Sequence, residues 1–208
     1  METRDENPAE LPYTSHMNVA FPAPSQLERH KFTVDDVLEM TALGLIDKRA
    51  ELLDGEIFDV PEDGFQHISV AMPLAQHIMA TLYGKSYFVG VQTTLRLSKH
   101  NAPSPDIYVL AGGLPKGDVL ADRILLVIEV ADTSLKDDLT DSASRYARHG
   151  VRDYWVIDVN ERVTYVHREP KDGAYPTPKR VEAQTSIAPL LVPELSITLS
   201  TIPGLDAS

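Results

Sequence analysis

The run ILLVIEV, from Ile124 to Val130, narrows the possible folds of this chain more than any other segment. Aliphatic residues that follow one another without alternation, in a run of this length, indicate a strand buried on both faces of a sheet. The segments Ile107 to Leu110 and Tyr154 to Ile157 have the same character. We therefore expect a mixed central sheet flanked by helices, in an α/β domain.

Three segments are predicted to be helical. Thr33 and Asp36 have the spacing of a capping box, and Gly44 is a residue type that commonly follows the last turn of a helix, so we expect a helix over residues 34–43. Apolar residues at helical spacing predict two further helices, over 66–82 and 138–149.

Turn and strand signals complete the predicted order of elements. Asp54-Gly55 lies between two runs that carry apolar residues, which predicts a β-hairpin over 50–58. Pro73 is expected to kink the helix over 66–82 or to mark its first turn. The remaining segments are predicted as an alternating strand over 87–97, short strands over 163–166 and 195–202, and a polar linker over 168–186.

Composition excludes several classes of protein. No apolar stretch approaches the ~18 residues that span a bilayer, and the acidic, proline-containing N-terminus does not resemble a secretory signal. The absence of cysteine excludes disulfides, thiolate nucleophiles and Cys-ligated zinc. We expect a cytoplasmic protein in which residues 1–30, with Pro8, Pro12, Pro22 and Pro24, form a flexible arm ahead of one domain over 31–208.

The charge balance and the common motifs exclude further functions. A net charge of −12 argues against a protein whose main task is to coat phosphate backbones, although it does not exclude local phosphate contact. The sequence Gly84-Lys85-Ser86 looks like the end of a P-loop, but Met79 stands where a glycine is needed. No G-x-S-x-G, HExxH or G-x-G-x-x-G motif occurs.

Two acidic residues stand in unusual places. Glu129 interrupts an apolar run, where an ionised carboxylate is costly unless something pairs with it. Asp106 follows Pro105 at the start of a predicted strand. Adjacent strands would present these two carboxylates side by side, which suits Mg²⁺ or Mn²⁺. The alternative is that Asp106 caps a turn and Glu129 faces solvent at a strand end.

An ordered succession of motifs resembles the Uma2 family of restriction-endonuclease-like proteins, within the PD-(D/E)xK nuclease superfamily. The motifs are ELLDG from Glu51 to Gly55, His67, SPDI from Ser104 to Ile107, VIEVAD from Val127 to Asp132, and YARHGVRDYWVID from Tyr146 to Asp158. The resemblance covers roughly residues 31–202. It implies a restriction-endonuclease-like fold and divalent-metal-dependent hydrolysis of DNA.

The resemblance also implies a set of site residues. It assigns Asp106 and Glu129 as ligands of Mg²⁺ or Mn²⁺, Glu51 as a further acid of the site and possible ligand, and His67 as a neighbour that could also bind the metal. For His67 the alternative is a structural or surface histidine.

The lysine of the superfamily is missing. The position two residues after Glu129 is Ala131, and the position at which Uma2-like chains carry a lysine in the following helix is Ser142. Arg145, one helical turn further, or Lys136 in the preceding loop could supply a cation instead. An arginine stays protonated, so it can stabilise a transition state but is a poor base. The other reading is a weakened or inactive site.

Two functions therefore stay open at the level of the sequence. The first is a metal-dependent DNA endonuclease in which Asp106 and Glu129 hold the ion and Glu51 assists. The second is a catalytically inactive binding or dimerisation module on the same fold, which Ser142 and the net charge of −12 favour. A homo-oligomer is possible in either case. Three arginines, Arg145, Arg148 and Arg152, could contact phosphates or form a solvated helix face.

Overall fold

The computed structural model describes residues 28–46 and 49–205. The chain divides into two compact units, Met1–His30 and Lys31–Ser208, and every helix and strand described below belongs to the second. The arm predicted over residues 1–30 lies outside the described residues except for its last three positions. Among the described residues, no helix combines the length and apolar character needed to cross a membrane.

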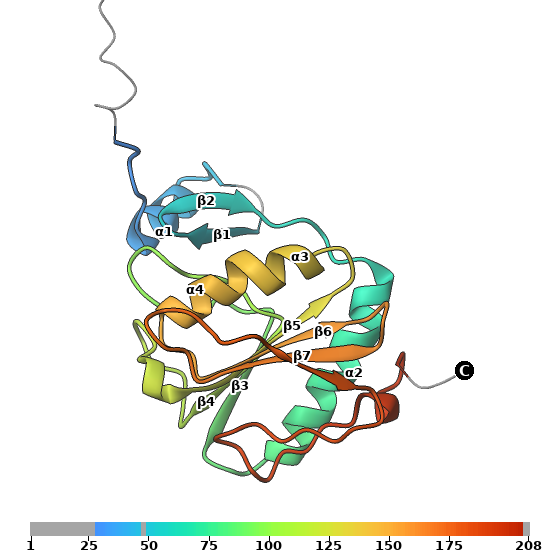
Figure 1. Cartoon of the computed structure of the whole chain (residues 1–208). Helices are drawn as coiled ribbons and strands as arrows, with labels where there is room; N and C mark the ends of the chain where they lie inside the picture. The colour runs from blue at the N-terminus through green and yellow to red at the C-terminus, as the bar shows by residue number, and fades with distance from the viewer. Residues whose placement is uncertain (1–27, 47–48, 206–208) are drawn as a thin grey trace, which may run out of the picture. The chain divides into compact units, whose positions relative to one another are not determined.

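A six-stranded mixed sheet forms the centre of the second unit, with the strand order β3-β4-β5-β6-β7-β8 (Figure 1). Only β5 and β6 are parallel, and all other neighbours are antiparallel. The sheet confirms the mixed α/β fold and the three strands predicted from apolar runs. The strands are β3 (Tyr87–Val91), β4 (Ile107–Ala111), β5 (Ile124–Ala131), β6 (Asp153–Asp158), β7 (Val163–Arg168) and β8 (Lys179–Glu182).

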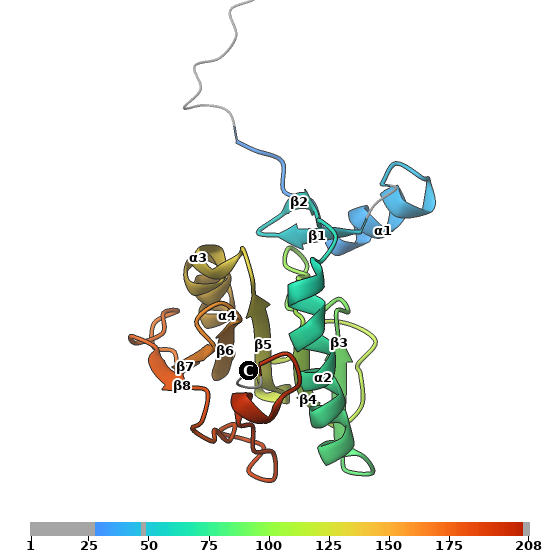
Figure 2. The same ribbon diagram turned by 90° about the vertical axis from the view of Figure 1, so that its right-hand side faces the viewer.

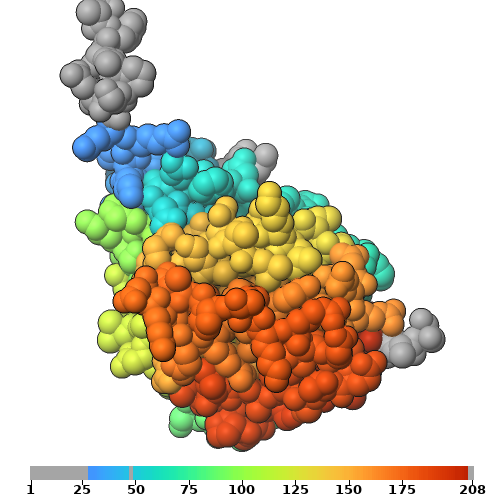
Figure 3. Space-filling model, in the orientation of Figure 1, coloured from blue at the N-terminus to red at the C-terminus, as the bar shows by residue number. Residues whose placement is uncertain are grey.

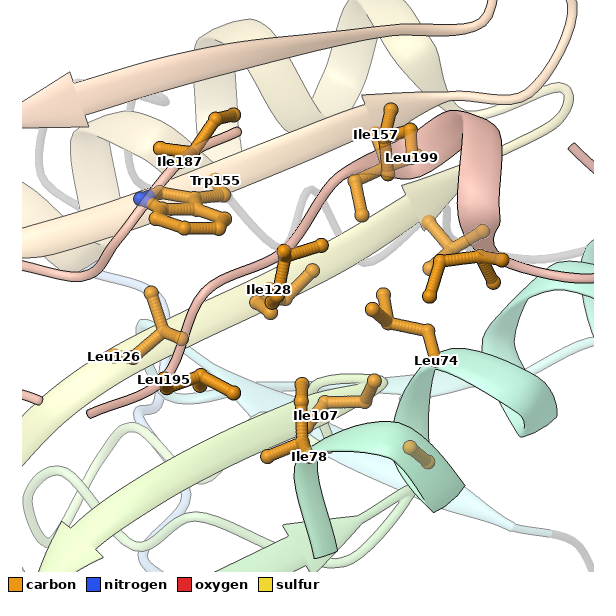
Figure 4. Close-up of a cluster of buried hydrophobic side chains, with 14 of the residues drawn as sticks. Leu74, Ile78, Ile107, Leu126, Ile128, Trp155, Ile157, Ile187, Leu195 and Leu199 are labelled. Atoms are coloured by element: carbon orange, nitrogen blue, oxygen red, sulfur yellow. The ribbon is translucent and has the colours of Figure 1, made fainter. Parts of the chain in front are cut away.

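Helices cover both faces of the sheet (Figure 2). On one face lies α2 (Phe65–Leu82), and its Leu74 and Ile78 pack with Ile128 of β5 in the buried cluster of Figure 4. On the other face, Val127 of β5 belongs to a second cluster that contains Tyr146. Because successive strand residues point to opposite faces, the unbroken apolar run of β5 fills both clusters.

The second face is covered by the crossover that joins the parallel strands β5 and β6. The crossover consists of α3 (Leu135–Asp137), the π-helical turn η3 (Asp138–Ser142) and α4 (Ala143–Arg148). Gly150 follows with a φ of 74°, a left-handed conformation that favours glycine after a helix. The helix predicted over 138–149 is thus confirmed, with a π-helical turn that the sequence analysis did not predict.

A hairpin and a short helix precede the main sheet. The helix α1 (Val34–Ala42) has the predicted capping box between Thr33 and Asp36. The hairpin pairs β1 (Ala50–Leu53) with β2 (Glu56–Asp59), and Asp54 and Gly55 at its turn have φ values of 53° and 86°, as a type I′ turn requires. The amide of Ala102 donates to the carbonyl of Leu52 at 2.7 Å, which ties the hairpin to the loop that leads into β4.

The strand predicted over 87–97 is wrong beyond Val91. Gln92 has a φ of 46°, so the chain leaves the ladder there and its amide donates to the carbonyl of Asp106 at 3.0 Å. Leu95 and Leu97 are buried, as the alternation predicts, but they pack beside the loop at 101–103 and not within the sheet. Alternate residues that are buried outside a sheet therefore give the same sequence pattern as residues of a half-buried strand.

Three smaller predictions also need correction. The strand predicted over 195–202 is a single bridge between Ile187 and Ile197 followed by a 3₁₀ turn, η4 (Leu199–Thr201). The linker predicted over 168–186 contains the edge strand β8, whose outer residues are charged. Pro73 lies in the middle of the continuous helix α2, so it does not mark a first turn.

Candidate active site

Asp106 and Glu129 lie side by side at the point where β4 begins opposite β5. The amide of Asp106 donates to Oε2 of Glu129 at 3.1 Å, and the amide of Val130 donates to Oδ2 of Asp106 at 2.7 Å. This reciprocal bonding follows from the antiparallel register, in which Ile107 pairs with Ile128. The sheet therefore fixes two carboxylates next to each other, and neither is a solvent-facing residue at a strand end.

The second oxygen of Glu129 accepts a hydrogen bond from a buried tyrosine. The hydroxyl of Tyr146 in α4 donates to Oε1 of Glu129 at 2.9 Å. Burial, and then the charges of Asp106 and Asp138, raise the pKa of Glu129 well above its ordinary value. Burial and the nearby charge of Glu129 also raise the pKa of Tyr146, so this tyrosine stays protonated and acts only as a donor.

Asp138 is a third carboxyl group of the cluster, which the sequence analysis missed. It is buried in the π-helical turn, and the hydroxyl of Ser134 donates to its Oδ2 at 2.5 Å. Burial, and then the charge of Asp106, raise the pKa of Asp138 to about 6, while hydrogen bonds from Ser134 and Ser142 act in the opposite direction. The hydroxyl of Ser142, at the expected lysine position, is thus near enough to Asp138 to lower its pKa.

His67 of α2 contacts Asp106 directly. Its Nε2 lies 3.0 Å from Oδ2 of Asp106, and its Nδ1 lies 3.8 Å from Oδ1 of Asp63. The hydrogen bond to Asp106 is the largest cause of a raised pKa at His67, and burial opposes it. The buried histidine is therefore a partner of the Asp106 carboxylate, and this bond occupies the nitrogen that points toward the acidic pair.

Glu51 of β1 reaches the same region from the hairpin. The amide of Ser104, two residues before Asp106, donates to Oε1 of Glu51 at 2.7 Å. Burial raises the pKa of Glu51, and the Ser104 amide and then the positive charge of Arg145 act against this rise. The repulsion between Glu51 and Asp106 adds to the rise, so the two carboxylates are near enough to interact electrostatically.

The arginines of α4 face the hairpin. Nε of Arg145 lies 3.8 Å from Oδ2 of Asp54, and Arg148 donates to the same oxygen at 2.9 Å. Figure 3 shows the hairpin directly against this helical segment. The Arg145 side chain is nearly buried, and within the described residues its Nε has no hydrogen-bond partner. Arg145, together with Arg49, is thus a cation whose charge acts on Glu51.

The other candidate cations lie away from the acidic pair. Lys136 in α3 is exposed, and Arg152 pairs with Glu169 at 2.7 Å on the surface. Arg148 is half exposed and is held by Asp54. Of the basic residues considered from the sequence, Arg145 alone interacts with an acid predicted for the site.

The carboxylates of the cluster meet the requirements of a divalent cation in part. Among residues 28–46 and 49–205, no group of three or more His, Asp or Glu side chains is arranged to hold a metal ion. The Asp106–Glu129 pair by itself fits Mg²⁺, which proteins commonly bind through one or two carboxylates while waters and substrate phosphates complete the shell. A cation there would also relieve the repulsion that raises the pKa of Glu129.

A cavity of about 940 Å³ opens next to this cluster. It is lined by Arg49, by the segment from Asp59 to Asp63, and by Ile68 of α2. Asp63 connects the cavity to the cluster, because its carboxylate lies 3.8 Å from Nδ1 of His67 and accepts a hydrogen bond from Gln92 at 2.6 Å. Asp63 and His67 therefore link Asp106 to this hollow, although neither Asp106 nor Glu129 is among its lining residues.

Sequence reasoning missed Asp138, Tyr146 as a partner of Glu129, and Asp63. Tyr146 stood within a motif of the resemblance, so its position in that motif was a usable signal. Asp138 lies in the polar run KDDLTD, which resembles a solvated helix face, and the π-helical turn that buries it has no evident sequence signal. Asp63 stood in a loop with no motif.

Comparison with known proteins supplies a family. The model of the Uma2 family, described as "Putative restriction endonuclease", matches residues 35–200. Among solved structures, the crystal structure of "a putative nuclease belonging to DUF820" from Anabaena variabilis is similar, with a TM-score of 0.65. That likeness has 17% sequence identity and covers 82% of this chain and 97% of the other, so it concerns the fold. No curated protein matches the chain. Because the family match covers most of the sequence, the chain belongs to the Uma2 family.

Proposed function

We propose that this protein hydrolyses phosphodiester bonds of DNA with Mg²⁺ or Mn²⁺ as its cofactor, at a site formed by Asp106 and Glu129. The observation that carries the proposal is the pair of hydrogen bonds from the Asp106 amide to Glu129 and from the Val130 amide to Asp106, which fix adjacent carboxylates near the end of β5. Membership of a family described as restriction endonucleases supports DNA as the substrate. A cytoplasmic location is consistent with such a substrate and with the absence of cysteine.

Asp106 and Glu129 would hold the metal ion, which when bound supplies a Lewis acid and lowers the pKa of a coordinated water. The neighbouring donors keep these carboxylates in place: the amide of Val130 on Asp106 and the hydroxyl of Tyr146 on Glu129. His67 orients Asp106 from the side of α2. Such supporting hydrogen bonds commonly matter 10–100-fold for metal affinity or activity.

Glu51 and Arg145 are proposed to face the phosphate from the hairpin side. Glu51 has a raised pKa and lies near Asp106, so it can accept or hold a proton there or assist through a water. Arg145 keeps its charge and can offset the charge that develops on the phosphate. The attraction of Arg145 to Asp54 and Glu51 limits that role. A lysine at position 142 would instead lie close to the acidic cluster. We therefore propose a weakened nuclease.

A non-catalytic binding or dimerisation module is the second candidate. The observation in its favour is Ser142, whose hydroxyl contacts Asp138 where a lysine is expected. A fold that kept its acidic pair but lost this cation could still bind a metal or DNA without cleaving it.

Cleavage of supercoiled plasmid by the full chain tests the proposal. We expect nicking in millimolar Mn²⁺, none in EDTA, and a loss of at least about 100-fold in Asp106→Asn and Glu129→Gln. Asp122→Asn, which changes an exposed carboxylate of the 3₁₀ turn η2 (Ala121–Arg123), is the matched control and should cleave like the wild type. Cleavage that survives both site substitutions would indicate a contaminating nuclease or another site. Retention of plasmid in a gel-shift assay without any cleavage would favour the binding module.

A further inference from the structure

The helix α2 carries an unusual surface for so acidic a chain. Its sequence FQHISVAMPLAQHIMATL contains no Asp, Glu, Lys or Arg, although 24% of the chain is charged. Several of its large apolar side chains are nonetheless exposed to solvent: Phe65 (89%), Ile68 (44%), Met72 (46%) and Met79 (49%), together with Tyr83 (90%) at its C-terminal cap. We call these five residues the α2 stripe.

The α2 stripe lies along one face of the helix. At 100° per residue its members fall within about 60° of the helix circumference, and they extend along roughly 27 Å of helix. The residues that pack on the sheet, such as Leu74 and Ile78, lie on a different face. The C-terminal segment covers yet another side, where Nε2 of His77 donates to the carbonyl of Ser196 at 3.1 Å (Figure 2). The stripe is therefore separate from the faces of α2 that pack on the sheet and on the C-terminal segment.

The stripe is also symmetric about its own centre. Phe65 and Tyr83 are equally distant from position 74, Ile68 and Met79 are nearly so, and Met72 faces the position of the exposed Gln76. If a second copy of this helix is laid antiparallel across a two-fold axis at position 74, the aromatic ends meet each other and Ile68 meets Met79, while Met72 meets Gln76. A two-fold interface requires this kind of self-complementary patch.

The net charge of the chain also favours a second copy of the chain as the partner of the stripe. Two copies that each carry a net charge of −12 repel one another over most of their surfaces, and the repulsion is weakest where no carboxylate faces another. The charge-free helix provides such a surface. Exposed apolar contiguous patches of this kind mark interaction sites more often than chance.

From these observations we propose that α2 forms a two-fold homodimer interface, in which the α2 stripe packs antiparallel against the same stripe of a second copy. The occupant is a second copy of this chain because the nearly symmetric order of the side chains makes the stripe complementary to itself. The proposal does not depend on the nuclease activity, since none of the proposed catalytic or metal-binding residues belongs to the stripe, although Ile68 also lines the cavity near the candidate site.

Disulfide trapping tests the antiparallel orientation of the two helices. Because the natural chain contains no cysteine, only the introduced cysteines can form disulfides. Phe65→Cys and Tyr83→Cys are made separately in the full chain, with different mass tags. After mild oxidation, the mixture of the two variants should give the mixed disulfide-linked dimer, whereas each variant alone should give little dimer. Self-linked Phe65→Cys dimers would indicate parallel helices and would overturn the antiparallel arrangement.

Light scattering during size-exclusion chromatography tests the interface itself. The wild type at tens of micromolar should elute with the mass of a dimer, and Met72→Glu combined with Met79→Glu should elute as a folded monomer by circular dichroism. Leu120→Glu is the matched control, because it replaces a leucine that is 66% exposed outside α2, and it should remain dimeric. A monomeric wild type, or a dimer that tolerates both glutamates, would overturn the proposal and assign the stripe to a partner of another sequence.

Discussion

The hydroxyl of Tyr146 donates a hydrogen bond of 2.9 Å to Oε1 of Glu129, and it joins the crossover helix to the central strand of the sheet. The other oxygen of Glu129 accepts from the amide of Asp106. Both oxygens of a carboxylate in an apolar surrounding are thus held by donors from two different elements. This arrangement sets the position of Glu129 and explains how a glutamate is tolerated within ILLVIEVA.

The first prediction concerns this hydrogen bond. Tyr146→Phe should lower the free energy of unfolding by about 1–2 kcal/mol, because it removes a donor from a buried acceptor. It should also weaken Mn²⁺ binding roughly 10-fold, since a supporting bond on a proposed ligand is lost. Urea denaturation in EDTA and calorimetric titration with Mn²⁺ measure the two effects.

Tyr175→Phe is the matched control for that variant. Its hydroxyl donates to the carbonyl of Val151 at 2.6 Å on the same side of the sheet, but it contacts no carboxylate. It should lose a comparable amount of stability and keep its Mn²⁺ affinity. Equal Mn²⁺ affinities for Tyr146→Phe and the wild type would contradict the positioning role of Tyr146.

The second prediction concerns pH. Asp138 has a pKa of about 6 in the folded chain against 3.8 in an unfolded one, so its contribution to stability is complete below pH 3.8 and is lost as the pH rises through 6. His167 is buried, and burial lowers its pKa from 6.5 to about 4. Its contribution is complete above pH 6.5 and is lost as the pH falls through 4. The two residues therefore act in opposite directions over the same range.

Substitution separates these opposing contributions. Asp138→Asn should raise the free energy of unfolding at pH 7.5 by up to about 3 kcal/mol, from roughly two pKa units at 1.36 kcal/mol each. In the same variant, stability should fall more steeply from pH 6.5 to 4 than in the wild type, because the contribution of Asp138 that opposes that of His167 is removed. Urea unfolding in EDTA across this range measures both. An unchanged pH profile in Asp138→Asn would mean that this carboxyl is not perturbed.

The third prediction concerns the missing lysine. Ser142→Lys should place an ammonium near Asp138, which the Ser142 hydroxyl contacts, and near the Asp106–Glu129 pair. Single electrostatic catalytic groups contribute roughly 10²–10³ in rate, so we expect plasmid cleavage in Mn²⁺ to rise by about that scale. Ser142→Ala is the control and should match the wild type.

One combination of results would refute the weakened site. If Ser142→Lys folds and binds Mn²⁺ yet cleaves no faster, while Arg145→Ala abolishes a wild-type activity, then Arg145 already supplies the catalytic cation. Its position beside Glu51 makes this a meaningful comparison.

The central strands could be predicted because their burial leaves a local signal. The runs that became β4, β5 and β6 are buried almost throughout, so composition alone identified them. Residues 92–97 and 195–202 show similar apolar spacing, but whether a partner strand lies beside them depends on distant parts of the chain. At residue 92 a left-handed backbone conformation ends the ladder, and an ordinary glutamine gives no sign of it.

The candidate site divides in the same way. The pairing of Asp106 with Glu129 follows from the register of two strands that the sequence predicts, so it could be anticipated. The burial of Asp138 depends on a π-helical turn, and the pairing of Arg145 with Asp54 depends on how the hairpin packs on α4. Both are tertiary relationships that no local pattern encodes.

The fourth prediction is that a divalent cation binds at Asp106 and Glu129, on which the proposed hydrolysis depends. A cation that binds only the folded chain stabilises it by mass action, so the melting temperature in millimolar Mn²⁺ should exceed that in EDTA. Asp106→Ala and Glu129→Ala should each abolish this increase, and Glu129→Ala should be at least as stable as the wild type in EDTA because a buried charge is removed. The direct measurement is thermal unfolding of these three proteins in Mn²⁺ and in EDTA. An increase confined to the wild type is the predicted result, whereas equal melting temperatures in the wild type, or an increase that survives both substitutions, would contradict the site.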